Sequence, residues 1–525
     1  MLSGDPGTKL PLNIGLRIWC SLSYSSAKKF KLIGEPEETG SFFRVRRFME
    51  ERLGSDLALS PWDGEVKLPY DTISEETREI LSSAFPTMKI SYDILSRFMA
   101  SIGRGSTEVL LAREGLIEPV DAVLHTGYDA LGDLLPSLGS RNIRAVIRGG
   151  GTGVTEGLRR RKKGILVAID TTSLKNIEIG KNWIRVGSGW KGKELEGLLN
   201  QRGYTMGNFP ESLADSTIGG WLSTKASGQE SNSYGDIEDM VISLDLYRSD
   251  FTLKDSHKVR ESSGMTSKDI AVGGEGRNGI VGDITMKIHP APGRRHYGSF
   301  FFRSFQEGVE ALSKFNHFPS VVRLHDQLET QFLLSAARDS TMKRALLKWM
   351  EVRGIRRGSG SLAIMVDNGK RLHRPIGSVS SGKSIARMWE KNRFGRPDIG
   401  NGLWRMGLVP DTLETSATWE RIMDIYEATR RTFSDECREL RLRGEIMAHI
   451  SHLYETGAAI YFTFVITPGK GSSDLIRLRR KLVQGFIENG GAITHHHGIG
   501  TEFASLVDEG RKALFSLVED PVLGD

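Results

Sequence analysis

Three consecutive histidines, His495, His496 and His497, precede the tripeptide Gly-Ile-Gly near the end of this 525-residue chain. Imidazole titrates close to neutral pH and binds transition metals, so the run indicates a metal site or an acid/base cluster, unless it has no function. Neighbouring side chains on a strand or helix cannot all face one way, so a metal ion would need further ligands from elsewhere. The three interpretations stay open on the run alone.

A tyrosine with a distant position in the chain is the second chemical candidate. Tyr461 lies in the apolar run 458–466, whose length and composition predict a buried strand. A buried tyrosine most often only satisfies its hydroxyl with one hydrogen bond. Its hydroxyl would be available for chemistry only if it faced a pocket.

A different chemistry is indicated by a strand-like run, 145–147, that ends in Arg148 and a glycine cluster at 149–153. A diphosphate needs several backbone N–H groups pointing at it, and glycines allow that close approach. The spacing is not Gly-x-Gly-x-x-Gly, because Val154 holds the third-glycine position, and no Gly-Lys-Ser/Thr follows as in a P-loop. Two more segments rich in glycine and small hydroxyl residues follow, at 210–228 and 273–281. Together they suit an extended anionic ligand.

The order Arg-Gly-Gly-Gly-Thr, then Ser-Thr-Ile-Gly-Gly-Trp, then Gly-Glu-Gly resembles the FAD signature of the vanillyl-alcohol-oxidase/p-cresol-methylhydroxylase flavoprotein superfamily. The resemblance spans about 119–290. It implies an α+β fold, with a two-subdomain FAD-binding domain of the p-cresol-methylhydroxylase type and an α/β cap domain for the substrate. Some members attach FAD to a histidine of the first loop, where this chain has Thr152, and neither loop contains His or Cys. We therefore expect non-covalent FAD.

The resemblance assigns the diphosphate to the first loop, the isoalloxazine and ribityl side to the second segment, and the adenine or ribityl part to the third. The residues predicted to bind FAD are Arg148, Gly149, Gly150, Gly151, Thr152, Gly153, Pro210, Ser212, Ser216, Thr217, Gly219, Gly220, Thr224, Ala226, Ser227, Glu275, Gly276, Gly279 and Ile280.

Within the superfamily the chain is most similar to the alkyldihydroxyacetonephosphate synthases, over about 90–504. That family exchanges the acyl group of acyl-dihydroxyacetone phosphate for a fatty alcohol, in ether lipid synthesis, while the flavin N5 holds the substrate carbon. Such a reaction needs a base for a proton next to a carbonyl and a fixed cation for the departing carboxylate. By resemblance, Tyr461 is the catalytic tyrosine, Arg323 the essential arginine, and His495, His496 and His497 the essential histidines.

Three positions depart from that family. A stretch that carries a phosphate-binding Arg in the family reads Pro-Asp-Ile-Gly-Asn at 397–401, with Gly400 in place of the cation and Arg396 and Arg405 nearby. Asn208 replaces a His before the second FAD segment, and Thr501 replaces a basic residue. These changes bear on the substrate more than on the flavin.

Two other interpretations remain. The chain is alternatively an FAD-dependent oxidoreductase acting on an alcohol or a 2-hydroxy acid, or a flavin-binding protein without redox chemistry. A metal-dependent hydroxy-acid dehydrogenase fits poorly, because Tyr454, Tyr461 and His496 occupy its ligand positions and phenols would have to ionise to bind metal. No metal is therefore predicted.

Composition limits the partners. A net charge of +6 spread along the chain argues against nucleic acid. Two cysteines without CxxC spacing indicate a cytoplasmic protein, no apolar run is long enough for a bilayer, and segment 16–25 lacks signal-peptide order. We expect a small, lipid-like substrate, peripheral membrane contact and a homodimer.

The predicted domains are a mostly helical segment (1–115), the FAD-binding domain (116–293), the cap (294–470) and a C-terminal helical segment with the histidine turn (471–525). Helices are predicted at 41–53, 75–83, 92–111, 193–201, 418–441 and 470–489, and strands at 145–147, 165–169, 184–186 and 458–466.

Overall fold

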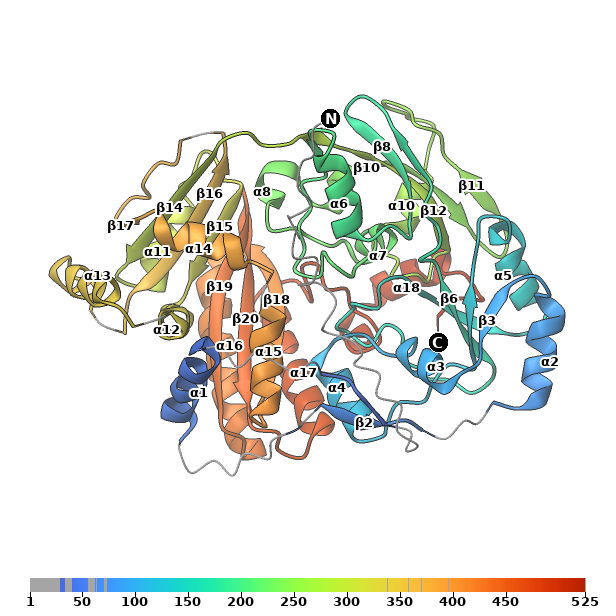
Figure 1. The fold of residues 1–525 in the computed structure, drawn as a ribbon, viewed down its shortest axis with the longest axis horizontal. Coiled ribbons are helices and arrows are strands. Elements are labelled where there is room, and N and C mark those ends of the chain that lie inside the picture. Colours follow the sequence, from blue (N-terminus) through green and yellow to red (C-terminus); the bar gives the residue numbers. More distant parts are fainter. Residues whose placement is uncertain are drawn as a thin grey trace, which may run out of the picture.

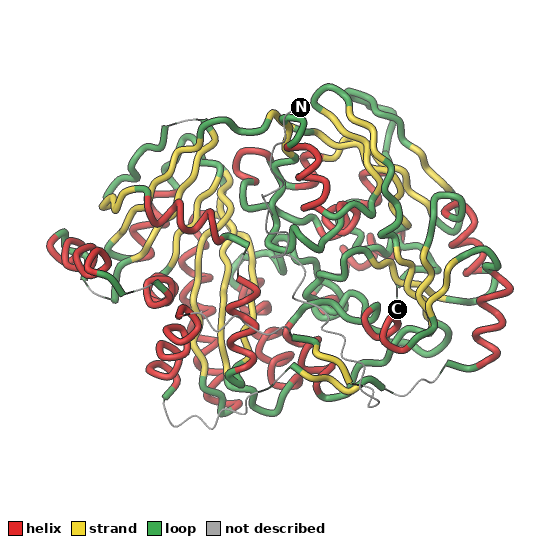
Figure 2. The backbone as a smooth tube through the Cα atoms, in the orientation of Figure 1, coloured by secondary structure: helices red, strands yellow, loops and turns green. Residues whose placement is uncertain are grey.

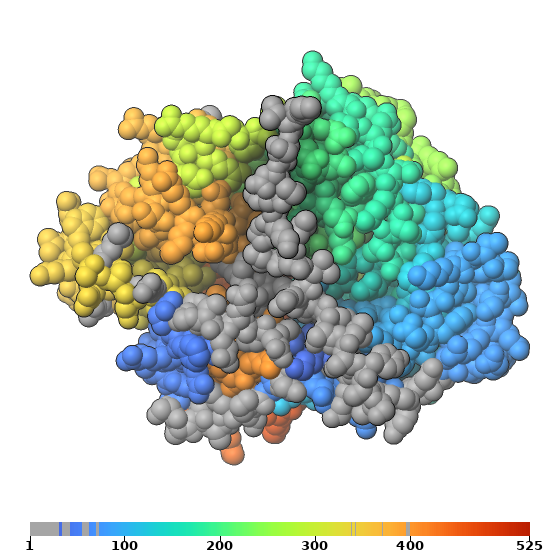
Figure 3. Space-filling view, in the orientation of Figure 1, coloured from blue at the N-terminus to red at the C-terminus, as the bar shows by residue number. Residues whose placement is uncertain are grey.

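The computed structural model describes residues 29–33, 40–54, 62, 64–69, 73–337, 339–356, 358–369, 371–394 and 396–524. The early segment 16–25 and Cys20 lie outside them. The described chain forms two halves that lie side by side, one built from the first part of the sequence and one mainly from the second (Figures 1 and 3). No described helix is both long and apolar enough to cross a membrane.

The first half begins with a four-stranded sheet in the order β3(Lys89–Ser91), β4(Ala122–His125), β6(Leu166–Asp170) and β5(Arg144–Arg148). β4, β6 and β5 are parallel, and β3 joins antiparallel. Their side chains are apolar on both faces, as in a covered parallel sheet: Leu124 and Ile169 pack in the core under α5(Leu131–Gly139), and Val123 and Ala168 pack on the other side. The chain end returns here, where the Ala145 N–H donates to the Val522 carbonyl.

A second sheet of the first half has five antiparallel strands in the order β11(Thr252–Lys254), β10(Val241–Tyr247), β12(Ile280–Lys287), β8(Trp183–Gly187) and β7(Ile177–Ile179). Short helices bury an apolar core against it: α6(Gly192–Asn200), α7(Ile218–Thr224), α9(Ile237–Met240) and α10(Ser267–Ala271). α8(Ser231–Tyr234) lies next in the chain to α9, and β9(Tyr204–Thr205) pairs with β13(His289–Pro290).

The second half is a seven-stranded antiparallel sheet, whose strands are the yellow segments on the left of Figure 2. Its order is β17(Val379–Gly382), β14(Arg295–Phe302), β16(Ser361–Asn368), β15(Val321–His325), β19(Gly444–Tyr454), β20(Gly457–Ile466) and β18(Val409–Thr418). The predicted α+β class is confirmed by these two halves.

Alternation along the strands decides which helices cover which face. Ile460 and Phe462 of β20 point to the core with α11(Phe305–Leu312), α16(Trp419–Leu440) and α17(Ser472–Glu488). Val465 points to the opposite face, where α1(Gly40–Leu53), α12(Gln327–Ala336) and α15(Arg396–Arg405) pack at one end. α13(Thr341–Val352) and α14(Ser384–Asn392) cover β14 and β16 on that side.

The remaining described elements are β1(Lys29–Lys31), β2(Glu65–Lys67), α2(Glu75–Ala84), α3(Ile94–Met99), α4(Ser106–Arg113), η1(Ala504–Leu506) and α18(Glu509–Val518).

The predicted helix at 92–111 is wrong as a single element, because it is divided into α3 and α4. The Glu108 carboxylate of α4 accepts the N–H groups of Gly103 and Gly105, at 2.6 and 3.2 Å. These bonds hold the loop that separates the two helices. A Cβ on Gly103 would lie 2.2 Å from the Gly153 carbonyl oxygen. The two glycines therefore let this loop pack against the first glycine cluster.

Candidate active site

A cavity of about 400 Å³ lies where the two halves meet. The FAD-binding half lines it with the three glycine-rich segments, and the seven-stranded sheet adds Arg323, Ser451, His452 and Tyr461. The histidine turn contributes His496 and His497 to the lining. Apart from Ile280 and His495, the residues predicted to bind a flavin and those predicted to react thus line one cavity.

Close packing explains the first two glycines of the cradle. A Cβ on Gly149 would lie 2.3 Å from Thr217 Oγ1, and one on Gly150 would lie 2.2 Å from the Asp215 carbonyl oxygen. Any side chain at either position would push the second FAD segment away from the first. A Cβ on Gly153 would instead stand in open space. The cluster therefore joins two segments and leaves a bare backbone surface.

The polar atoms of this surface fit a flavin dinucleotide. Among the hydrogen bonds of the described chain, none uses the N–H of Gly150, Gly151 or Thr152. Ser188 Oγ and Arg148 Nε line the cavity and are buried without a partner in the described chain. Since buried polar groups are normally hydrogen-bonded, a ligand with phosphates and hydroxyls would satisfy them.

All the predicted FAD residues line the cavity except Ile280, which is fully buried in the core of the four-stranded sheet. Glu275 has a task that the sequence did not suggest. Its carboxylate accepts the N–H groups of Ile499 and Gly500, at 2.7 and 2.8 Å, so it fixes the turn that follows the histidines. Burial raises the pKa of Glu275, and Arg277 and these two N–H groups oppose that rise.

A row of polar side chains crosses the seven-stranded sheet at its cavity face. Register pairs Glu414 of β18 with Tyr461 of β20, Tyr461 with His449 of β19, and His449 with His325 of β15. Directly paired residues of antiparallel strands point to the same face, so the four side chains form one row. Their neighbours along each strand point into the apolar core, which fixes the row in place.

A β-bulge adds His452 to this face. The register of β19 shifts between Ile450 and His452, so that His452 pairs with Ala459 although it lies an odd number of residues after His449. The extra residue, Ser451, reverses the alternation, which brings His452 to the cavity with its Nδ1 at 2.7 Å from Ser231 Oγ. Burial and the neighbouring His495 lower the pKa of His452 well below its usual range.

The Glu414 carboxylate binds the backbone of the histidine run. Its Oε1 accepts the Thr494 hydroxyl at 2.6 Å and the N–H groups of His496 and His497 at 3.1 and 3.0 Å, and its Oε2 accepts the His495 N–H at 2.5 Å. Burial would raise the pKa of this carboxyl, but the three histidines and the Thr494 hydroxyl outweigh it and lower the pKa well below its usual range. The turn is therefore built around an ionised, buried carboxylate.

Tyr461 meets two of the three histidines. Its hydroxyl lies 2.5 Å from His496 Nε2 and 3.2 Å from His497 Nε2. Burial lowers the pKa of both imidazoles, that of His496 most strongly, while Glu414 opposes the change. A neutral imidazole at hydrogen-bond distance from a phenol is a base that can take its proton.

Arg323 is oriented through a buried histidine. Its guanidinium lies 2.6 Å from His449 Nε2, and His449 Nδ1 lies 2.9 Å from Glu329 Oε2. Because a guanidinium only donates, His449 must accept with Nε2 and carry its proton on Nδ1. Burial would raise the pKa of Glu329, but His449 and His325 lower it well below its usual range. The carboxylate thus fixes the tautomer that holds Arg323.

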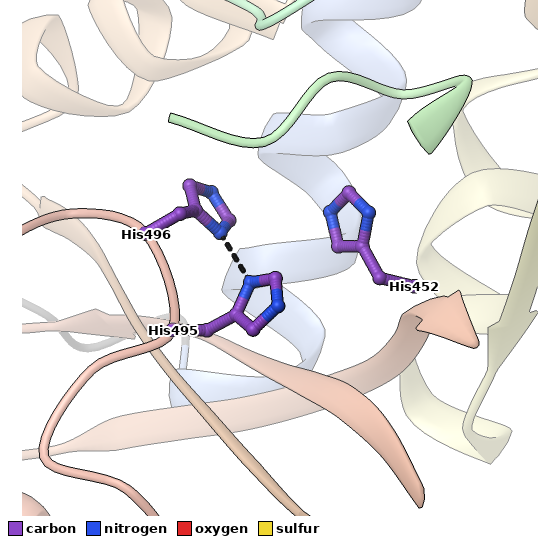
Figure 4. Close-up of side chains that lie close together, drawn as sticks. All are labelled: His452, His495 and His496. Carbon is purple, nitrogen blue, oxygen red and sulfur yellow. Dashed lines mark hydrogen bonds between the residues drawn. The ribbon is translucent and has the colours of Figure 1, made fainter. Parts of the chain in front are cut away.

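Three groups of described side chains bring donor atoms within 4.8 Å of one another, close enough to hold a metal ion. They are His452 with His495 and His496, His325 with Glu329 and His449, and Glu414 with His496 and His497. Figure 4 shows the first group, in which His495 Nδ1 and His496 Nδ1 are hydrogen-bonded at 2.8 Å.

The structure does not place every predicted site residue in the cavity. His495 is outside the described lining and lies behind His496, where its Nε2 is 2.5 Å from the Tyr454 hydroxyl. Adjacent residues of a turn point in different directions, so the three histidines cannot all face one substrate. Arg405, which lies near Gly400 in the sequence, is also outside the described lining, and the Arg396 side chain lies outside the described residues.

Comparisons with known proteins agree with this geometry. Residues 123–254 match the FAD binding domain family, and residues 291–515 match the C-terminal domain of FAD linked oxidases. The chain therefore carries an FAD-binding domain followed by the C-terminal domain found in FAD linked oxidases. Its cofactor is FAD, and its first half is the FAD-binding part.

Two relatives of this chain have different names. The alkyldihydroxyacetonephosphate synthase of Dictyostelium discoideum is 26% identical over 467 residues, which cover 83% of this chain and 76% of that protein. An uncharacterised FAD-linked oxidoreductase of Escherichia coli strain K12 is 25% identical over 388 residues, covering 70% and 78%. A solved alkyldihydroxyacetonephosphate synthase superposes with a TM-score of 0.77 at 22% identity, covering 94% of this chain and 95% of that one. The superposition shows a shared fold.

Several residues of the site were missed from the sequence. Glu414 was missed because nothing in a lone glutamate indicates a carboxylate that accepts the backbone N–H groups of the histidine turn. His449 and Glu329 orient Arg323 only because β15, β19 and α12 meet. The alternation of β19 could have indicated His449, since it lies between apolar core residues.

Proposed function

We propose that this flavoprotein exchanges the ester-linked acyl group of acyl-dihydroxyacetone phosphate for a fatty alcohol, which makes an ether bond. Support comes from the similarity to synthases over most of the chain and from the cavity, where a neutral histidine, a tyrosine and an arginine meet beside the FAD cradle. Bound FAD would supply the atom that holds the substrate carbon between departure of one group and arrival of the other.

The observation that carries the proposal is that Arg323, Tyr461 and His496 line one cavity and are linked, since Tyr461 bonds His496 and stacks on His449, the partner of Arg323. In the proposed reaction, Arg323 binds the carboxylate as it departs, with its donors directed by His449. Tyr461 and His496 move the protons, since the phenol and the imidazole already share a hydrogen bond at 2.5 Å. His497 contacts the same hydroxyl and restrains it.

The test is a product assay with the FAD-loaded protein. We expect a radiolabelled long-chain alcohol to enter acyl-dihydroxyacetone phosphate as an alkali-stable ether lipid, with one fatty acid released for each ether formed. Tyr461→Phe should lose the exchange and keep its flavin. Absence of exchange by the wild-type protein, under conditions where it holds FAD, would reject the proposal.

The second candidate is an oxidoreductase for an alcohol or 2-hydroxy acid. It is favoured by the missing phosphate cation, since Gly400 lies on α15 and no residue of α15 is among the described lining residues of the cavity. Its test is spectroscopic. If this function holds, an alcohol or a 2-hydroxy acid added without oxygen should bleach the flavin absorbance. Acyl-dihydroxyacetone phosphate and a fatty alcohol should instead leave the flavin oxidised if the protein is a synthase.

The partner predictions form part of the same proposal. We propose a lipid-like substrate, peripheral contact with a membrane, a homodimer and non-covalent FAD, with domain boundaries at 116–293 and 294–470. Light scattering measures the oligomer, flotation with anionic vesicles measures membrane contact, and limited proteolysis tests the boundaries. Flavin that stays with the protein precipitated by acid would show a covalent bond.

A further inference from the structure

A continuous line of hydrogen bonds leads from the cavity into the protein. The Tyr461 hydroxyl lies 2.5 Å from His496 Nε2, and His496 Nδ1 lies 2.8 Å from His495 Nδ1. His495 Nε2 lies 2.5 Å from the Tyr454 hydroxyl, which donates to Asp236 Oδ2 at 2.8 Å. Figure 4 shows the central pair, His495 and His496. Only Tyr461 and His496 of these residues line the described cavity.

The direction of each bond follows from its far end. An ionised Asp236 only accepts, so the single proton of Tyr454 points to it and the Tyr454 oxygen must accept from His495 Nε2–H. With both imidazoles uncharged, His495 Nδ1 is then an acceptor, and the proton between the two rings belongs to His496 Nδ1. His496 Nε2 is left as an acceptor, which receives the Tyr461 hydroxyl proton.

In this order the facing nitrogens of His495 and His496 are bonded to each other. Of the two facing nitrogens of His495 and His496, one carries a proton and the other accepts it, and His452 Nδ1 is engaged by Ser231. Each O–H and N–H donor along the line then has an acceptor in the next residue. The cluster is therefore complete as a chain of proton carriers.

We propose that Tyr461, His496, His495, Tyr454 and Asp236 form a proton relay that removes the hydroxyl proton of the incoming alcohol. The proposal rests on the proposed exchange reaction. In that reaction an alcohol and an acyl ester give an ether and a free carboxylate, so one proton must leave the cavity for each turnover.

The relay balances this proton. The Tyr461 O–H bond breaks as a proton passes to His496 Nε2, His496 Nδ1 gives its proton to His495 Nδ1, His495 Nε2 gives its proton to the Tyr454 oxygen, and Tyr454 gives its own to Asp236. The Tyr461 oxygen, now anionic, takes the proton of the alcohol and so produces the attacking alkoxide. Charge moves from Asp236 to the alcohol oxygen, and the proton that leaves the cavity is held on Asp236.

His495, Tyr454 and Asp236 are thus relay residues that act through Tyr461 and His496, which explains why a histidine outside the cavity belongs to the site. Asp236 is the far end of the line and lies just before α9, in the FAD-binding half. The line therefore connects the two halves at the reacting end.

The first test needs no substrate and so does not depend on the proposed exchange. In the FAD-loaded protein with ¹⁵N-labelled histidine, we expect His496 as the Nδ1–H tautomer and His495 as the Nε2–H tautomer, assigned by His495→Gln and His496→Gln spectra. His496 found as the Nε2–H tautomer, or His495 found as an imidazolium, would overturn the relay.

The second test uses Tyr454→Phe and Asp236→Asn with the exchange assay in H₂O and D₂O. Both should retain FAD and substrate KM while kcat falls roughly 10-fold or more, since positioned proton transfer contributes about 10²–10⁴. The curved dependence of the wild-type rate on D₂O fraction should become linear in Tyr454→Phe. Tyr128→Phe is the matched control, because it removes another tyrosine-to-aspartate bond, to Asp283, away from the relay.

The two tests separate the possible failures. Wild-type kcat and a curved D₂O dependence in Tyr454→Phe would reject the relay and leave the exchange reaction standing. No exchange by the wild-type protein would reject the proposed reaction, and the tautomers would then still decide whether the hydrogen-bond order is correct.

Discussion

Replacing Glu414 by Gln tests how the histidine turn is held. An amide has one acceptor oxygen where the carboxylate has two. If that oxygen takes the place of Oε1, the bonds to Thr494, His496 and His497 remain, but the amide N–H₂ then faces the His495 N–H. The variant therefore loses one charge-assisted bond and leaves one buried N–H without an acceptor.

The cost follows from these two changes. A hydrogen bond to a charged group contributes about 1.5–3 kcal/mol, and a buried unpaired N–H costs about 1–3 kcal/mol. We expect a loss of about 3–5 kcal/mol in the free energy of unfolding, seen as a lower urea midpoint by flavin fluorescence and far-UV circular dichroism. We also expect kcat to fall at pH 7 even where the variant is still folded, because the turn positions His496 against Tyr461.

The effect has a pH dependence of known sign. The pKa of Glu414 is lower in the folded protein than its ordinary value of 4.5. Its contribution to the free energy of unfolding is therefore complete above about pH 5 and is lost progressively as the pH falls from 4.5 toward the folded-state pKa. The gap between wild type and Glu414→Gln should narrow by about 1.4 kcal/mol for each pH unit below 4.5.

Glu445→Gln is the matched control on β19 of the same sheet, from which β18 is separated by β20. Glu445 is partly exposed and pairs with Arg52 at 3.3 Å, so its change should cost about 0–1 kcal/mol. Equal urea midpoints for Glu414→Gln and wild type at pH 7 would refute the account of the carboxylate below the turn.

Three further predictions concern the cofactor and the reacting end. Gly150→Ala should lose most bound FAD, measured by the ratio of flavin to protein absorbance, because its Cβ would lie 2.2 Å from a backbone oxygen; Gly197→Ala on α6, outside the described cavity lining and with open space for its Cβ, should keep it. Arg323→Lys should cut kcat by roughly 10-fold or more with FAD retained, because an ammonium cannot copy the planar fork held by His449, and unchanged kcat would argue against that role. Tyr461→Phe should abolish turnover and leave the flavin spectrum intact, so full activity would remove the phenol from the mechanism.

The FAD cradle was predictable because close backbone approach demands glycine at fixed positions, and the sequence shows them together. The strand of Tyr461 was predictable from its apolar run, and β20 matches it closely. The division at Gly103 was not, because it depends on contact with Gly153, far away in sequence. Periodicity read the segment as one helix.

The reacting end could be predicted only in part. Residue types suggested Tyr461 and the histidines, and resemblance suggested Arg323. The bulge that turns His452 to the cavity, and the separation of His495 from it, depend on a shift of register and a turn that no local pattern announces. Such long-range placement is decided by packing between the two halves.

The most direct test of the central claim is the fate of oxygen and electrons in one experiment. Alcohol labelled with ¹⁸O is mixed anaerobically with the FAD-loaded protein and acyl-dihydroxyacetone phosphate, and the lipid is analysed by mass spectrometry while the flavin absorbance is followed. If the flavin holds the substrate carbon during the exchange, we expect ¹⁸O in the ether product, an unlabelled fatty acid and an oxidised flavin after turnover. Labelled aldehyde together with a stoichiometrically bleached flavin would contradict the account and show an oxidoreductase.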